Sequence, residues 1–149
     1  MSDDFIKIEF ENKDVQNALL KLAEKGENLR PLMKNIAGIF ASSTEENFKD
    51  QGRPKWQDLK ESTKKQREKK RKWPGQILQV EGMLASSLNT YYDNDSAIIG
   101  SNLPYAAIHQ LGGQAGRNKS AEIPARPYLK LSEYDYKEIL SETEKYFKD

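Results

Sequence analysis

The chain has 149 residues, a length that suits one folded domain over residues 1–149 and is too short for two well-buried ones. Hydrophobic residues make up 36% of it and charged residues 32%, so it is expected to fold around a modest core. Its net charge of +1 gives the whole molecule no general affinity for polyanions, and the absence of cysteine excludes disulfides and thiolate metal sites.

The N-terminal third is predicted to form one strand and two helices. Residues 5–10 alternate between apolar and polar side chains, which is typical of a half-buried strand. Asp14 is the predicted N-cap of a first helix that ends near Gly26. Pro31 fits the first turn of a longer second helix. The stripe of that helix becomes polar toward its C-terminal end and consists of Leu32, Ile36, Ile39, Phe40, Ser43 and Asn47.

A strongly basic segment follows over residues 56–73. Between Lys60 and Lys72 lie eight basic and two acidic residues, a local charge of +6 that leaves −5 for the remainder of the chain. Leu59 is the only aliphatic residue from Trp56 to Lys72, so a helix here has no apolar stripe to bury. We predict an exposed basic arm outside the core.

The remaining residues are predicted to form a hairpin and further helices. Residues 76–88 have a partly helical pattern interrupted by Gly82, and strands at 90–92 and 97–99 flank a turn at residues 93–96. The later elements are a short helix over 104–111 ended by Gly112 and Gly113, a loop over 114–121, an extended segment over 123–131 and a last helix capped by Ser132 with Asp135. The predicted fold class is α+β, a small antiparallel sheet with a hairpin packed against two or three longer helices.

A search for catalytic groups gives no enzyme-like constellation. His109 is the only histidine, which excludes a two-histidine metal site within one chain. Its sequence neighbours supply no carboxylate to orient it, so we interpret it as a structural histidine bonded beneath the following loop; a hydrolase that uses it is the alternative. The glycines at 112, 113 and 116 lack the Lys-Ser/Thr ending of a phosphate-binding loop. No catalytic residue, cofactor or metal ligand is predicted.

The basic arm supports a second hypothesis, a nucleic-acid-binding protein that works through Lys60 to Lys72. Its cations would neutralise phosphates while Trp56 and Trp73 stack on bases. A solvated face, or a segment that orders on an acidic protein partner, is the competing explanation. The candidate contacts to DNA or to a partner are Lys64, Lys65, Arg67, Lys69, Lys70 and Arg71.

Five local patterns occur in a fixed order along the chain. They are Gly52–Leu59, Ser62-Thr63, Ile77-Leu78 with Gly82–Leu84 and Ser87, Tyr105–Gly113, and Ile123–Leu129. In this order and spacing, over about residues 30 to 149, they resemble the phage virion morphogenesis family, whose members include tail-completion proteins of contractile-tailed, Mu-like phages.

The resemblance implies a non-enzymatic phage or prophage assembly protein that acts in tail completion and head-tail joining. It also implies a cyclic homo-oligomer with head-to-tail contacts, and other phage tail, neck or connector proteins as partners. Such a protein would work in the host bacterial cytoplasm during assembly, or in the virion tail or neck. It would need no membrane, because no apolar run in the chain approaches the length that spans a bilayer and no export signal is visible. It would need no small-molecule substrate, because its motifs have a structural explanation.

The motif residues themselves have a structural explanation. Trp56 is expected to anchor the start of the arm by burying its ring, and His109 and Gln110 to hydrogen-bond the neighbouring loop. Two prolines are expected to fix the backbone around Arg126 and to present its guanidinium to a carboxylate. The candidate structural or interface residues are Trp56, Tyr105, His109, Gln110, Gly112, Gly113, Pro124, Arg126 and Pro127.

Overall fold

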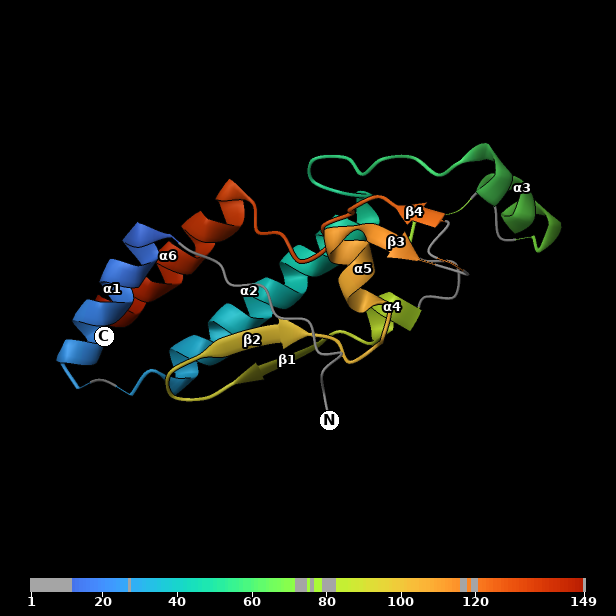
Figure 1. Cartoon of the computed structure of the whole chain (residues 1–149). Coiled ribbons are helices and arrows are strands. Elements are labelled where there is room, and N and C mark those ends of the chain that lie inside the picture. The colour runs from blue at the N-terminus through green and yellow to red at the C-terminus, as the bar shows by residue number, and fades with distance from the viewer. Residues whose placement is uncertain are drawn as a thin grey trace.

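The computed structural model of the chain describes residues 12–26, 28–71, 75, 77–78, 83–115, 118 and 121–148 (Figure 1). The strand predicted over residues 5–10 and the indole of Trp73 lie outside this part. The described elements are α1 (Lys13–Glu24), α2 (Arg30–Lys49), α3 (Glu61–Lys69), α4 (Met83–Ser86), β1 (Asn89–Tyr92), β2 (Ala97–Gly100), α5 (Ala106–Leu111), β3 (Gly113–Ala115), β4 (Ala121–Ile123) and α6 (Glu133–Lys148). Helices with two small antiparallel sheets confirm the predicted α+β class.

Helix α2 is the central element, with α6 packed on one side and the β1–β2 hairpin on the other, while α1 packs against α6 (Figure 1). Pro31 lies in its first turn as predicted. The predicted stripe is buried at Leu32, Ile36 and Phe40, and burial continues through the polar Ser43 and Asn47. This helix therefore carries both an apolar and a polar contact surface into the core.

The first helix is capped two residues earlier than predicted. The Asn12 side chain accepts a hydrogen bond from the Val15 backbone N–H at 3.1 Å, and its own backbone is extended. Asp14 instead lies in the first turn, where a carboxylate is favoured by the helix dipole. The prediction of Asp14 as the cap was wrong because both residues have suitable side chains, and only the backbone conformation distinguishes them.

The predicted hairpin is confirmed, with Asn89 opposite Gly100 and Tyr92 opposite Ala97. The Asp93 carboxylate accepts hydrogen bonds from the backbone N–H groups of Asp95 and Ser96, at 2.8 and 2.7 Å, and so shapes the turn. Every residue of β1 is exposed, whereas Ile99 of β2 is buried.

The loop predicted over residues 114–121 was wrong at both of its ends. There β3 and β4 pair antiparallel, with Gly113 opposite Ile123 and Ala115 opposite Ala121. Strands of only three residues are too short for an alternation of apolar and polar side chains to be recognised in the sequence. The partly helical pattern over 76–88 is confirmed only at Met83–Ser86 within the described residues.

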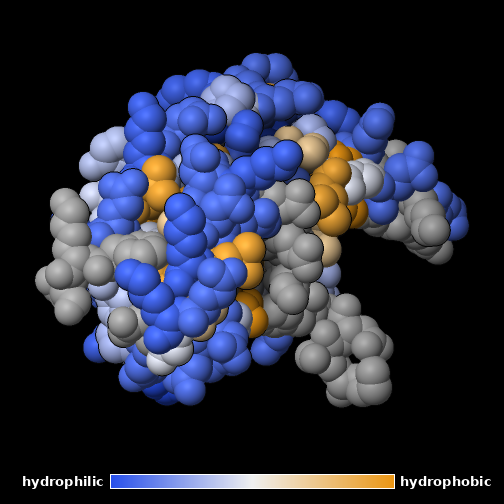
Figure 2. Space-filling view, turned by 90° about the vertical axis from the view of Figure 1, so that its left-hand side faces the viewer, coloured by the Kyte–Doolittle hydropathy of each residue, from blue (hydrophilic) through white to orange (hydrophobic). Residues whose placement is uncertain are grey.

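The surface that carries α1 and α6 is predominantly hydrophilic, with small hydrophobic patches between charged side chains (Figure 2). Leu20 and Tyr134 are exposed on these two helices, by 60% and 68%. No helix in the described part of the chain is both long and apolar enough to cross a bilayer.

Candidate functional site

The extended segment 124–131, hereafter the strap, runs through the middle of the fold and is held from α2 chiefly by the Asn47 side chain. Asn47, 1% exposed, donates from its amide nitrogen to the carbonyl oxygens of Tyr128 and Lys130, at 2.7 and 2.9 Å. Buried backbone groups outside a sheet need such partners. Asn47 therefore replaces the hydrogen bonds that a neighbouring strand would supply.

Helix α5 holds the strap from its other side. The Gln110 side-chain oxygen accepts hydrogen bonds from the backbone N–H groups of Tyr128 and Leu129, at 3.0 and 2.9 Å, which confirms the predicted role of this glutamine. The Tyr128 hydroxyl, fully buried, donates to the Ala106 carbonyl oxygen at 2.6 Å, and its ring stacks on Phe48. Burial raises the pKa of Tyr128, so it remains a donor.

Helix α5 ends at a glycine, as predicted, and the close approach of the strap explains why a glycine is needed there. Gly112 ends the helix at a φ of +76°. A Cβ atom there would lie 2.8 Å from the Ala125 backbone nitrogen. Glycine is needed at this position because both the left-handed backbone and the close approach exclude a side chain.

A buried polar cluster of Ser43, Asn47, Arg53 and Asp135, hereafter the polar bracket, joins α2 to the start of α6. Arg53 donates to the Asn47 side-chain oxygen at 2.8 Å and to the Asp135 carboxylate at 3.2 Å. Asp135 also accepts from the Ser43 hydroxyl at 2.6 Å and from the Ser132 backbone N–H at 2.8 Å. Burial raises the pKa of Asp135, but these hydrogen bonds and the Arg53 charge outweigh it and lower the pKa overall.

The capping signal predicted from Ser132 and Asp135 is confirmed, but the rest of the polar bracket was missed by sequence reasoning. Arg53 lies within the Gly52–Leu59 pattern, and no buried partner was predicted for it. A usable signal was present, because Ser43 and Asn47 continue the apolar stripe of α2 at helical spacing. Polar side chains on the buried face of a helix require buried partners.

Trp56 anchors the root of the arm, as predicted. It is 7% exposed, its indole N–H donates to the Pro127 carbonyl oxygen at 3.2 Å, and its ring meets Phe48 edge-on. Gly52, at a φ of +102°, permits the preceding turn, because a Cβ atom would lie 2.5 Å from the Trp56 nitrogen. The predicted stacking of Trp56 on a nucleic-acid base was wrong, because its ring is buried in the core against Phe48.

Arg126 lies inward rather than outward. It is 6% exposed and donates to the carbonyl oxygens of Gln57 and Asp58, at 3.0 and 3.2 Å. Among the described residues its hydrogen-bond partners are these carbonyl oxygens, and none of those residues supplies the expected carboxylate contact. Burial and the nearby charge of Arg67 lower the pKa of Arg126. The hydrogen bonds of Arg126 therefore connect the strap to the root of the arm.

The backbone of His109 contributes a hydrogen bond to the fold, whereas one nitrogen of its side chain is buried without a hydrogen bond to any described residue. Its carbonyl oxygen accepts from the Arg126 backbone N–H at 2.8 Å, and its ring packs edge-on against Tyr105. Within the described residues its buried Nδ1 has no hydrogen-bond partner, and the loop that was predicted to bond this side chain lies partly outside them. Burial, with the charge of Arg126, lowers the pKa of His109 below 6.5.

This environment predicts a pH-dependent stability. The unfolded chain protonates His109 near its ordinary pKa of 6.5, whereas the folded chain does so only at lower pH. The unfolded state thus binds more protons just below pH 6.5, and the free energy of unfolding falls as the pH drops through that range. We expect wild type to lose more stability than His109→Gln between about pH 7.5 and pH 5.5 in urea titrations. Equal losses in the two proteins would contradict this.

The cations of the arm divide into two groups. Lys64 lies 2.8 Å from the Asp58 carboxylate and 3.5 Å from that of Glu61, and Arg67 is half-buried toward the body. The exposed cations that follow Lys64 are Lys65, Lys69, Lys70 and Arg71, and Lys60 just before α3 is exposed as well. No residue of α3 is buried, and this helix stands apart from the other helices at the edge of the molecule (Figure 1).

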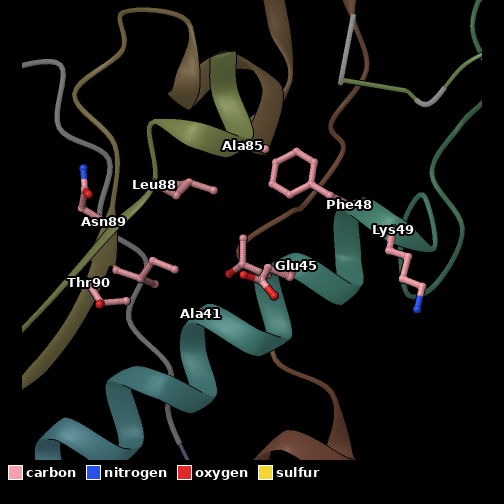
Figure 3. Close-up of a pocket in the computed structure, with 10 residues that line it drawn as sticks. Ala41, Glu45, Phe48, Lys49, Ala85, Leu88, Asn89 and Thr90 are labelled. Carbon is pink, nitrogen blue, oxygen red and sulfur yellow. The ribbon is translucent and has the colours of Figure 1, made fainter. Parts of the chain in front are cut away.

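A groove of about 450 Å³ lies between α2 and the β1–β2 hairpin (Figure 3). Its lining is mixed, with Phe48, Leu88 and Ile99 beside polar residues such as Asn89 and Thr90. Glu45 lies along the same edge of α2, whereas the Lys49 ammonium points away from the groove (Figure 3). Among the described residues, no three His, Asp or Glu side chains gather as a metal site.

The sequence of the chain was compared with protein families, with curated proteins and with solved structures. Residues 10–148 match the model of the phage virion morphogenesis family, and the chain belongs to that family. It is 40% identical over 145 residues to Mu-like prophage FluMu G protein 2 of Haemophilus influenzae, covering 95% of this chain and 96% of that one. It is 38% identical over 133 residues to the putative capsid assembly protein G of Escherichia phage Mu, covering 85% of each. No solved structure matches the chain.

Proposed function

We propose that this protein is a non-enzymatic subunit that completes the phage tail and makes it competent to join the head. Its family assigns it to virion assembly. The observation that carries the proposal is the use of the family-like motifs: Trp56, Gln110 and Arg126 all bond to backbone groups of the same chain. Motifs used in this way preserve a shape for assembly partners rather than a reaction centre.

The proposed working form is a cyclic homo-oligomer that contacts tail, neck or connector proteins. Leu111, 64% exposed at the end of α5, and the groove between α2 and the hairpin, which is lined in part by Phe48 and Ile99, are two different surfaces. A contact between copies that joins different surfaces is head-to-tail, and it closes into a ring when the rotation between neighbours allows. Light scattering across a concentration series, in low and moderate salt, tests this with wild type and Leu111→Glu.

Deletion of the gene in an inducible prophage tests the role in the tail. We expect electron microscopy of the lysate to show DNA-filled heads and separate tails, and added purified protein to restore joined particles. A lysate without closed heads would contradict the proposal and indicate capsid assembly, the role that the name of the phage Mu relative gives to that protein. Mass spectrometry of purified virions would show whether the protein leaves the host cytoplasm within the tail or neck.

A further inference from the structure

The outer end of the arm, residues 65–71, hereafter the arm tip, concentrates positive charge. It contains Lys65, Arg67, Lys69, Lys70 and Arg71 with Glu68 as the single acid, a net charge of +4 within seven residues. Lys65, Lys69, Lys70 and Arg71 are exposed. At this density, and with a single acidic residue in the segment, the tip creates a local positive potential despite the near-neutral chain.

The fold holds this charge away from the rest of the molecule. Trp56 and Arg126 fix the root of the arm to the strap, and Lys64 bonds to Asp58 at the beginning of α3. Helix α3 then stands apart from the helices that form the core (Figure 1). The tip is therefore presented by a fixed root, which reduces the ordering that a partner must impose.

The chemistry of the tip favours a polyanion over a protein. No residue of α3 is buried, and residues 60–71 contain no aliphatic or aromatic side chain. Protein interfaces have a core enriched in aromatic residues and depleted in charge, which this segment cannot supply. Phosphate contacts need only cations at suitable spacing.

We propose that the arm tip binds the phosphate backbone of double-stranded DNA without sequence preference. The binding residues are Lys65, Lys69, Lys70 and Arg71. The inference rests on the charges of the arm and not on the role in the tail, so either can fail without the other.

The test is fluorescence anisotropy of a labelled random-sequence duplex of about 30 base pairs, titrated with the full-length protein from about 50 to 200 mM salt. Wild type is expected to bind with a log–log salt slope of about −3, as for three or four neutralised phosphates. The triple variant Lys65→Gln, Lys69→Gln and Lys70→Gln is expected to bind at least about tenfold more weakly with a flatter slope. Glutamine is a good helix former, and circular dichroism and the melting temperature verify that the fold persists.

The matched control removes three exposed charges from the body through Lys13→Gln, Lys34→Gln and Lys137→Gln. It is expected to keep most of the affinity. Equal loss in the control and arm variants would overturn the proposal, because net charge alone would then explain binding. Absence of wild-type binding at about 50 mM salt would also overturn it. So would an arm variant that retains DNA binding but fails to restore joined particles, which would make the tip a protein-docking surface.

Discussion

Replacing Asn47 by alanine is expected to lower the free energy of unfolding by about 3 kcal/mol. The change removes two hydrogen bonds donated to the strap and the one accepted from Arg53. The side chain is 1% exposed, so water cannot replace these partners without opening the junction of α2 with the strap. Urea unfolding followed by circular dichroism gives the difference, and the melting temperature should fall by about 10 °C for a domain of this size.

Asn35→Ala is the matched control, since Asn35 lies on the same helix and is exposed. Its effect is expected within about 0.5 kcal/mol. If Asn47→Ala were no more destabilising than Asn35→Ala, the strap would not depend on α2 for its hydrogen bonds.

Replacing Tyr128 by alanine is expected to cost about 4 kcal/mol, the range for large aromatic side chains in a core. The ring is 0% exposed and stacks on Phe48 with centroids 5.5 Å apart. Tyr128→Phe keeps the ring but leaves the Ala106 carbonyl oxygen without its donor, so about 1–2 kcal/mol is expected for that change. The two variants separate the packing of the ring from the hydrogen bond of its hydroxyl.

Tyr134→Ala gives the reference for an exposed tyrosine, at 68% exposure on α6. It is expected to change the free energy of unfolding by less than about 0.5 kcal/mol. A Tyr128→Phe variant as destabilised as Tyr128→Ala would show that the hydroxyl, and not the ring, carries the contribution of this residue. Equal effects of Tyr128→Ala and Tyr134→Ala would contradict the buried position.

Predictions from the sequence succeeded where the signal is local. The periodic apolar residues of α2 and the turn residues of the hairpin act within a few positions, and both elements lie where they were predicted. The buried anchor Trp56 and the strap-binding Gln110 were also identified. The N-cap at Asn12 and the β3–β4 pairing were missed, because near-equivalent residues and very short strands give no distinct pattern.

The sequence by itself determined the helices, the hairpin and the charge of the arm, because these depend on the spacing and kind of neighbouring residues. The tertiary structure alone decided how the buried polar residues are paired. Asp135 accepts hydrogen bonds from Ser43 and Arg53, which lie 92 and 82 residues away in the sequence. Arg126 donates to the carbonyl oxygen of Gln57, 69 residues away. Each buried polar group takes whichever partner the packing of the core brings within reach, and that choice leaves no periodic trace along the chain.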